Sequence, residues 1–189
     1  GNFVLEQALW DSKSFLQQNP EFFINVNVSA KQLERPDFCR VVLELLDKTE
    51  FPVKHLCLEI TERCRSLPVS VINERMAVLR GYGIKFAMDD FGTGSSSSAM
   101  ALEMLIDEIK IDMSFIRKIL VNKKNKAIVQ SMVDFANAAN IKSCLEGVEN
   151  EALEDYLRTV GATWFQGYYY SKPVGADELE ILLSNSWKK

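Results

Sequence analysis

The chain has 189 residues, of which 47% are hydrophobic and 25% charged, and its formal net charge is −4. This composition is typical of a globular protein with a packed core, and it disfavours duplex nucleic acid as a partner, which usually requires a basic stripe. No apolar run approaches the roughly 20 residues of a membrane-spanning helix, and no signal peptide is visible. The scattered cysteines lack CxxC spacing and the only histidine is His55, which we expect in an exposed loop. A Cys/His zinc site is therefore disfavoured, and a cytoplasmic location is favoured.

Hydrophobic patterning predicts helices and strands that alternate along the chain. In chain order the first predicted elements are a helix at Phe3–Gln17, a strand at Phe22–Val28, a helix at Phe38–Leu46, a strand at Leu56–Ile60, a helix at Val69–Tyr82 and a strand at Ile84–Met88. They are followed by a helix from about Ser97 to Leu105, a strand at Ile109–Ile111, a helix at Lys126–Ala139, a strand at Ile141–Leu145, a helix at Glu151–Val160, a strand at Trp164–Tyr168 and a helix at Asp177–Leu183. The alternation predicts parallel strands with helical crossovers, and the lack of a linker predicts a single domain over residues 1–189.

The most informative segment is Asp89-Asp90-Phe91-Gly92-Thr93-Gly94, which follows the apolar run of the third predicted strand. Successive side chains of a strand point to opposite faces, so we expect the two carboxylates at the strand's end, where the backbone can turn. Adjacent carboxylates repel each other unless cations neutralise them, which favours divalent metal ions held by oxygen ligands. The alternative is an acidic turn, because Asp, Gly and Ser are common turn residues.

Polar residues recur near the ends of all the predicted strands: Asn27, Glu59, Asp89, Lys110, Glu146 and Gln166. Burying an unpaired charge costs several kcal/mol, whereas residues gathered at one end of a parallel barrel can satisfy one another and a ligand. That end is where such barrels place active sites. Taken singly, each residue can be a strand-end or capping residue, and we favour that interpretation for Ser29, Thr61 and Asp112. The oxygen-rich set favours two Mg²⁺ or Mn²⁺ ions, which suit attack of water on a phosphodiester.

Other phosphate-binding interpretations are weaker. The segment Gly92–Ser95 lacks the Gly-Lys-Ser/Thr ending of a P-loop. The cluster Lys123, Lys124 and Lys126 is interpreted as a solvated loop that leads into a helix. Tyr168 and Tyr170 are expected on one face of a strand end, with Tyr169 on the other.

Together these segments resemble the EAL domain family, bacterial phosphodiesterase domains that open cyclic di-GMP to linear pGpG. The resemblance spans essentially the whole chain and rests on Val26–Ser29, Leu58–Glu62, Asp89–Gly94, Lys110–Asp112, Glu146–Glu149 and Gln166–Tyr168, in the family's order. It implies an α/β fold, a TIM-like (β/α) barrel with one strand reversed.

The resemblance also implies residue roles. The metal ligands fall on Asn27, Glu59, Asp89 and Glu146, with Asp90 serving the second ion. Lys110 matches the lysine that contacts the attacking water, and Gln166 the glutamine beside the second metal site. Glu62 matches a glutamate that steadies the loop after the Asp pair, Glu149 a supporting acid, and Pro173 the border of a guanine pocket.

The chain departs from the family's pattern in two ways. The Glu-Ala-Leu signature has no counterpart, and Glu6–Leu9 lies in a predicted helix, so we expect an EAL-type barrel whose first strand is missing at the N-terminus. Either the sequence begins after that strand or the protein has lost it. A metal-binding glutamate and a phosphate-binding arginine would be absent in both cases, and we expect the missing glutamate to weaken one metal site and to reduce or abolish turnover by this chain. Ser95 and Ser98 replace residues usually aromatic and aliphatic, and Leu145 replaces a small alanine, changes expected to loosen a dimer-forming segment or to narrow a site wall.

These observations leave three functional hypotheses. The first is a cyclic di-GMP phosphodiesterase, which needs the full set of polar strand-end residues. The second is an inactive receptor that binds cyclic di-GMP, which the lost strand supports. The third is a protein-interaction scaffold, which does not explain those polar residues. The resemblance implies fused sensory or GGDEF modules and a homodimer formed through the loop and helix after Asp90, both of which are expectations.

Overall fold

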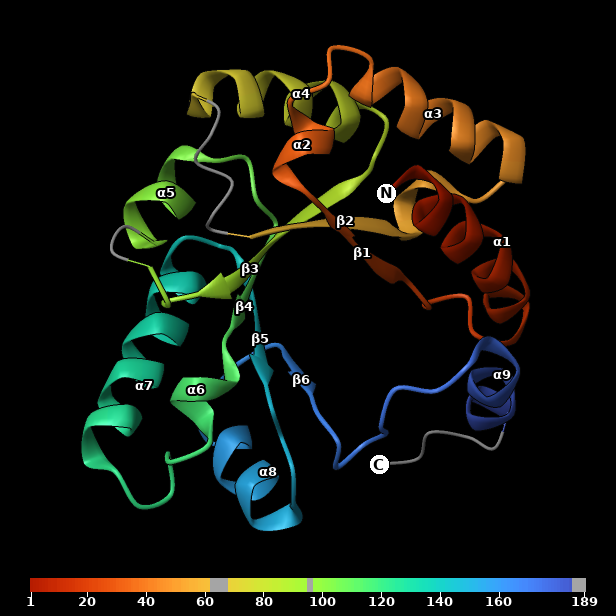
Figure 1. Cartoon of the computed structure of the whole chain (residues 1–189). Helices are drawn as coiled ribbons and strands as arrows, with labels where there is room; N and C mark the ends of the chain where they lie inside the picture. Colours follow the sequence, from red (N-terminus) through yellow and green to blue (C-terminus); the bar gives the residue numbers. More distant parts are fainter. Residues whose placement is uncertain (62–67, 95–96, 185–189) are drawn as a thin grey trace. The chain divides into compact units, whose positions relative to one another are not determined.

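The computed structural model describes residues 1–61, 68–94 and 97–184, in which helices and strands alternate (Figure 1). The elements up to the third strand are α1 (Asn2–Gln18), β1 (Ile24–Val28), α2 (Ala30–Leu33), α3 (Phe38–Thr49), the 3-10 helix η1 (Val53–His55), β2 (Leu56–Thr61), α4 (Val69–Gly81) and β3 (Lys85–Phe91). The later elements are α5 (Ser97–Glu103), β4 (Glu108–Ile111), α6 (Met113–Ile116), α7 (Lys123–Ala138), β5 (Lys142–Glu146), α8 (Glu151–Arg158), β6 (Trp164–Gln166) and α9 (Ala176–Ser184).

The strands form a six-stranded sheet whose order follows the chain from β1 to β6. The pairs β1/β2, β3/β4, β4/β5 and β5/β6 are parallel. Parallel neighbours need crossover connections, and the helices between successive strands supply them. The prediction of an α/β fold with parallel strands is therefore confirmed.

The chain divides into two compact units, which we describe separately. The first holds the described residues 1–60, 68–86 and 173–184, and the second holds 61, 87–94 and 97–172. Single-domain organisation over residues 1–189 stays a prediction.

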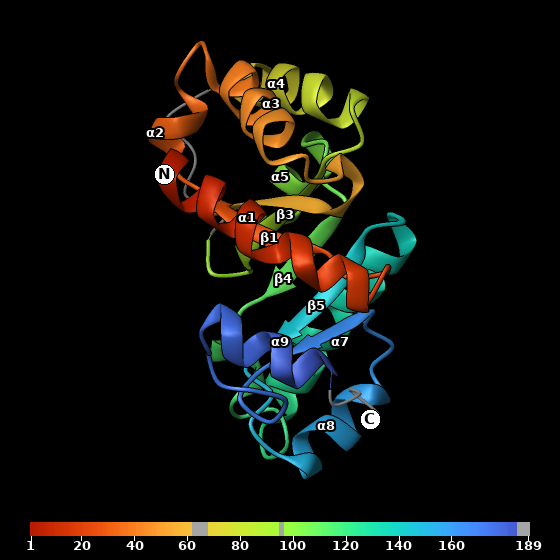
Figure 2. The ribbon, with the colours of Figure 1, turned by 90° about the vertical axis from the view of Figure 1, so that its right-hand side faces the viewer.

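Helix α1 organises the first unit. It packs against α3, β1 and α9 (Figure 2). The Gln18 amide donates a hydrogen bond to Glu180 Oε1 of α9 at 3.1 Å. Leu9 of α1 is fully buried. Removing such aliphatic side chains from water is the main favourable term in this core. The other fully buried side chains of this unit include Leu33, Leu56, Leu58, Ile60, Ile72, Met76 and Leu79.

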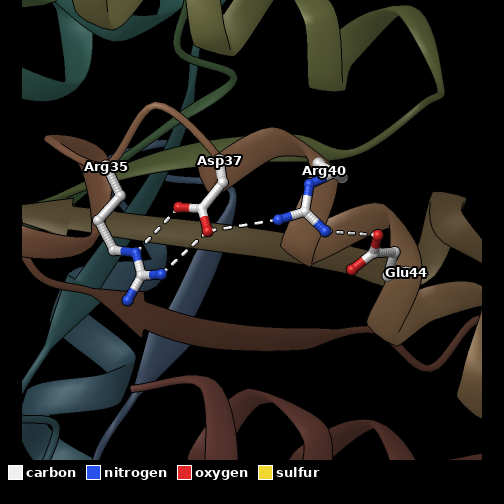
Figure 3. Close-up of polar contacts among 4 residues, drawn as sticks. All are labelled: Arg35, Asp37, Arg40 and Glu44. Atoms are coloured by element: carbon white, nitrogen blue, oxygen red, sulfur yellow. Dashed lines mark hydrogen bonds and ion pairs between the residues drawn. The ribbon is translucent and has the colours of Figure 1, made fainter.

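A short chain of ion pairs marks the start of α3 (Figure 3). Arg35 donates to both carboxylate oxygens of Asp37 at 2.9 Å, and Arg40 bridges Asp37 at 3.5 Å to Glu44 at 2.7 Å. The hydrogen bond from Arg35 holds the pKa of Asp37 below its ordinary value. These groups lie at the surface, where such pairs contribute little to stability, so we assign them the local role of fixing the helix start.

Helix α7 organises the second unit by packing its apolar face on β4 and β5. Phe135 of α7 stacks on Phe91 of β3 with ring centroids 6.1 Å apart. Val129 and Val133 of the same helix are fully buried, as the predicted amphipathic pattern requires.

Polar side chains begin three of the helices in this unit. Asn122 Oδ1 accepts hydrogen bonds from the first turn of α7, and Asn150 Oδ1 accepts one from Leu153 in α8. Asp112 accepts from Ser114 and so caps α6, as predicted. Each cap satisfies an N–H group that has no partner inside the helix.

Every predicted helix and strand has a counterpart, but several boundaries are wrong. The third strand continues through Asp89 and Asp90 to Phe91, and the sixth ends at Gln166, so the tyrosines that follow lie in turns. His55 is half-buried in η1, where its Nδ1 lies 2.7 Å from the Phe22 carbonyl oxygen. The third strand is longer because Phe91 pairs with Ile111 of β4 beyond a shift in register, and the sixth is shorter because hydrogen-bonded turns follow Gly167. Hydrophobic periodicity reveals neither feature. Within the described residues, no helix is long and apolar enough to cross a membrane.

Candidate functional site

The first unit contributes a small polar group on β1 and β2. Asn27 is in register with Glu59 across the parallel pair, and Asn25 lies two residues earlier on the same face. The Asn25 amide donates to Glu59 Oε1 at 2.8 Å, and Glu59 is only 4% exposed. A buried carboxylate needs such donors, so this hydrogen bond holds Glu59 in one orientation. We call Asn25, Asn27 and Glu59 the β1–β2 group.

The Asp89–Asp90 pair occupies a β-bulge at the end of β3. Met88 pairs with Ile109 and Phe91 pairs with Ile111, so two aspartates oppose the single residue between those partners. Asp90 has a φ of +56°, in the left-handed region that Asp tolerates better than most residues. The bulge interrupts the regular alternation of side chains between the two faces of the sheet. It supplies inside the strand the backbone turn that we expected after it.

Lys110 is the residue opposite this bulge, and it is only 5% exposed. Its Nζ lies 2.9 Å from Glu146 Oε1 and 3.7 Å from Asp89 Oδ1. The side chains of Glu146 and Asp89 are only 17% and 18% exposed to solvent. The lysine charge therefore lies in a poorly solvated environment. There an ion pair is electrostatically stronger than in water.

Glu146 is also in register with Gln166 of β6, which extends the group to another strand. Lys110 pairs with Cys144, two residues before Glu146, so Lys110, Glu146 and Gln166 share one face of the sheet. We call Asp89, Asp90, Lys110, Glu146 and Gln166 the β3–β6 group.

Two glycines shape the backbone next to this group. Gly147 has a φ of +80°, and a Cβ there would lie 2.6 Å from Met113 Cβ. A Cβ on Gly167 would overlap the backbone nitrogen and oxygen of Val148. The close approach permits the hydrogen bond from Val148 N–H to the Gln166 carbonyl oxygen at 3.0 Å. The chain after Glu146 is thereby fixed to the chain after Gln166.

The remaining predicted site residues are Glu62, Glu149 and Pro173. Glu149 is exposed after the Gly147–Val148 turn, and Pro173 is exposed in the first unit. Glu62 and Ser95 lie outside the described residues. Ser29, which we favoured as a capping residue, forms a capping box with Gln32.

Asn25 is a residue whose role we did not predict. The available signal was its spacing, because a residue two positions before Asn27 lies on the same face of a strand. Its hydrogen bond to Glu59 depends on the register between strands, which the spacing alone does not determine.

The donor chemistry of both groups suits a hard divalent cation, because carboxylate and amide oxygens are the ligands that Mg²⁺ and Mn²⁺ prefer. Glu59 and Glu146 are both held by neighbouring polar side chains. Within residues 1–61, 68–94 and 97–184, no group of three or more His, Cys, Asp or Glu is arranged to hold a metal ion. The predicted ligand set includes the Asn27 amide and draws on both units, and it stays a prediction.

The model of the EAL domain family matches residues 1–173. The cyclic di-GMP phosphodiesterase PdeA of Borreliella burgdorferi is 33% identical over 170 residues, covering 90% of this chain and 25% of that protein. The chain spans about a quarter of the length of the curated relatives it matches.

Solved structures show the same architecture. The EAL domain of Mycobacterium smegmatis DcpA matches with a TM-score of 0.93 and 29% identity, covering 98% of this chain and 84% of that one. A phosphodiesterase MucR structure in complex with c-di-GMP matches with a TM-score of 0.88 and 30% identity, covering 95% and 73%. These matches confirm the predicted EAL type of fold.

Proposed function

This chain belongs to the EAL domain family, and on that basis we propose that it hydrolyses cyclic di-GMP to linear pGpG. The observation that carries the proposal is the β3–β6 group. In this group the buried Lys110 lies opposite the Asp89–Asp90 bulge, and its Nζ is 2.9 Å from Glu146 Oε1. A structural ion pair alone needs neither a second aspartate nor an adjacent glutamine. Relatives named as cyclic di-GMP phosphodiesterases, and a relative's complex with c-di-GMP, support this substrate.

We assign the metal ligands to Asn27, Glu59, Asp89, Asp90 and Glu146, which offer only oxygen donors of the required kind. Two bound Mg²⁺ or Mn²⁺ ions would polarise the phosphoryl group and make a coordinated water more acidic. Asn25 would keep Glu59 correctly oriented through its 2.8 Å hydrogen bond. Such support of a ligand by a neighbouring side chain commonly governs metal affinity.

Lys110 would orient the attacking water and stabilise negative charge on the phosphoryl oxygens. The Lys110 ammonium group lies beside the carboxylates of Glu146 and Asp89. It could therefore turn from one of these carboxylates to a phosphoryl oxygen while it stays in the same poorly solvated environment. In the reaction the water oxygen bonds to phosphorus, one P–O ester bond breaks, and the departing oxygen takes a proton. The product is a linear dinucleotide with one new phosphate monoester and one new hydroxyl group.

The remaining assignments follow from the family. We assign Gln166 to the second metal site, Glu62 and Glu149 to support of the site, and Pro173 to the border of the guanine pocket. We also propose a homodimer formed through the loop and helix after Asp90, where Leu102 of α5 is 68% exposed. A cytoplasmic location agrees with the scattered cysteines, which lack CxxC spacing.

The decisive experiment measures conversion of cyclic di-GMP to pGpG in Mn²⁺, using chromatography of the products, by this chain and by the same chain extended with a Glu-Ala-Leu first strand. We expect turnover by the extended chain that is lost in Glu146→Gln and retained in Glu151→Gln, an exposed glutamate of α8. Binding of cyclic di-GMP without product formation would replace the proposal with the receptor hypothesis. Absence of both binding and turnover in the folded chain would leave the scaffold hypothesis.

A further inference from the structure

A loop joins α6 to α7 (Figure 1). This loop combines exposed aliphatic side chains with several cations. Val121 is 88% exposed and Leu120 is 42% exposed. Exposed cationic residues lie on both sides of these two. We define the α6–α7 patch as Arg117, Lys118, Leu120, Val121, Lys123 and Lys124.

All the charged residues of this patch are cations. No Asp or Glu occurs from Met113 to Val133, although the whole chain carries a net charge of −4. Across the part of the chain that the structure describes, none of the patch's cations forms an ion pair. The patch is therefore a local positive field on an acidic protein, available to an anionic partner.

Folding does not explain these residues. Lys123 and Lys124 are the first two residues of α7, where the helix dipole favours acidic side chains and disfavours cations. Asn122 already caps that helix end through the N–H groups of Lys124 and Asn125. The exposed Val121 side chain contributes little to packing, so the fold does not require an apolar residue there. The fold does not require the adjacent lysines either.

We propose that the α6–α7 patch docks this protein on an anionic lipid bilayer surface. The four cations would lie at the headgroup phosphates, and Leu120 and Val121 would enter the apolar edge of the interface. Charge complementarity together with apolar exposure favours this partner. A nucleic-acid strand would supply the charge, but it is usually bound with stacked aromatic side chains, and the patch contains none.

The test is co-sedimentation of the full chain with vesicles. We expect binding to equimolar phosphatidylcholine and phosphatidylglycerol, little binding to phosphatidylcholine alone, and weaker binding as salt is raised. The double variant K123Q/K124Q is expected to bind about tenfold more weakly. The matched control K31Q/K54Q, which removes two exposed lysines outside the patch, is expected to bind like the unmodified chain.

A second pair of variants separates a bilayer from other polyanions. Val121→Ser is expected to weaken vesicle binding about fivefold, whereas Val121→Leu retains it, because only a bilayer accepts the aliphatic group. Equal binding of V121S and V121L, or equal affinity for polyglutamate and polyuridylate, would overturn the proposal in favour of a purely ionic partner. Vesicle binding unaffected by K123Q/K124Q in a chain shown to be folded by circular dichroism would also overturn it. The proposal does not depend on hydrolysis.

Discussion

Lys110 is the residue on which the β3–β6 group depends. Its stem is buried on β4, and its Nζ contacts carboxylates from β5 and from the bulge of β3. Lysine is seldom buried unless its charge is paired, and pairing with Glu146 and Asp89 meets that requirement. The same contacts bring these two acids together, so a single lysine gives both local stability and a defined arrangement of oxygen atoms.

Replacing this lysine tests both roles. We expect Lys110→Met to lower the free energy of unfolding by about 1–3 kcal/mol, because Glu146 and Asp89 lose their charge partner but keep some solvent exposure. The proposed hydrolysis should fall by about a hundredfold or more, as is typical for loss of a positioned acid–base group. Urea denaturation and product chromatography measure the two effects.

The control for this variant is Lys85→Met, which changes an exposed lysine at the start of β3. It should change the free energy of unfolding by less than about 0.5 kcal/mol and leave turnover intact. Comparable losses in K85M and K110M would mean that removal of any lysine, rather than of the buried pair, is responsible.

Tyr170 forms a second defined group with Glu154 and Arg158 of α8. Its hydroxyl donates to Glu154 Oε1 at 3.1 Å, and Arg158 contacts the same carboxylate oxygen at 2.5 Å. Burial, followed by the hydrogen bond to Glu154, raises the pKa of Tyr170 to about 12. Both causes disfavour the phenolate form.

This shift predicts a change in alkaline stability. The raised pKa stabilises the folded state fully below the unfolded value of about 10, and this contribution is lost as pH rises through about 12. In Tyr170→Phe the free energy of unfolding should fall less steeply over that interval, and the phenolate absorbance should lose its latest step. Tyr168→Phe, which alters an exposed tyrosine, should retain that step; its disappearance there would contradict the assignment.

At the scale of elements, the end of β3 shows what the sequence could and could not predict. Adjacent aspartates after an apolar run correctly indicated that the backbone must turn at this position. The positive φ of Asp90 and the two-to-one opposition to Lys110 were not predictable, because they depend on pairing with β4. The Asn25–Glu59 hydrogen bond escaped prediction for the same reason, since it crosses from β1 to β2.

Helices were easier to predict than strand ends. The amphipathic pattern located α7 and α8, although α7 begins at Lys123, after the Asn122 cap and three residues before the predicted Lys126. Strand β6 ends early because Gly167 leads into turns closed by the hydrogen bond from Tyr170 N–H to the Gly167 carbonyl oxygen, at 3.1 Å. Aromatic residues favour strands, so the pattern through Tyr168 misled the prediction.

Gly167 gives a prediction about this junction. We expect Gly167→Ala to lower the free energy of unfolding by roughly 1–3 kcal/mol, because the added methyl group overlaps the backbone of Val148. The displacement should also reach Glu146 and Gln166, which flank the junction, and reduce turnover. Thermal denaturation and the hydrolysis assay measure these effects.

A second glycine provides the matched control. Gly81 is the last residue of α4, and a Cβ there meets nothing within 4 Å. Gly81→Ala should therefore raise the free energy of unfolding by up to about 1 kcal/mol. If G167A did not lower the free energy of unfolding relative to G81A, the close approach of Gly167 to Val148 would not contribute to stability.

For the whole molecule, alternation of helices and strands was the most predictive property of the sequence. Each predicted crossover is present, and comparison with solved EAL domains confirms the fold type. The division into two compact units was not predicted, because no linker or change of composition marks it. The proposed ligands Glu59 and Glu146 belong to different units, so a stability measurement on the complete chain is needed to relate them to a cation.

Metal removal provides that measurement. A ligand at one hundred times its dissociation constant stabilises the folded state by about 2.7 kcal/mol, which corresponds to a rise in Tm of roughly 5–10 °C for a chain of this size. We therefore expect Mn²⁺ to raise the Tm of the full chain and EDTA to reverse the rise. Glu59→Gln should reduce this rise, because the amide keeps the shape of the carboxylate beside Asn25 but removes its charge. The exposed Glu21→Gln should respond to Mn²⁺ like the unmodified chain. An undiminished rise in E59Q would show that the stabilising cation binds elsewhere, and would remove Glu59 from the proposed ligand set.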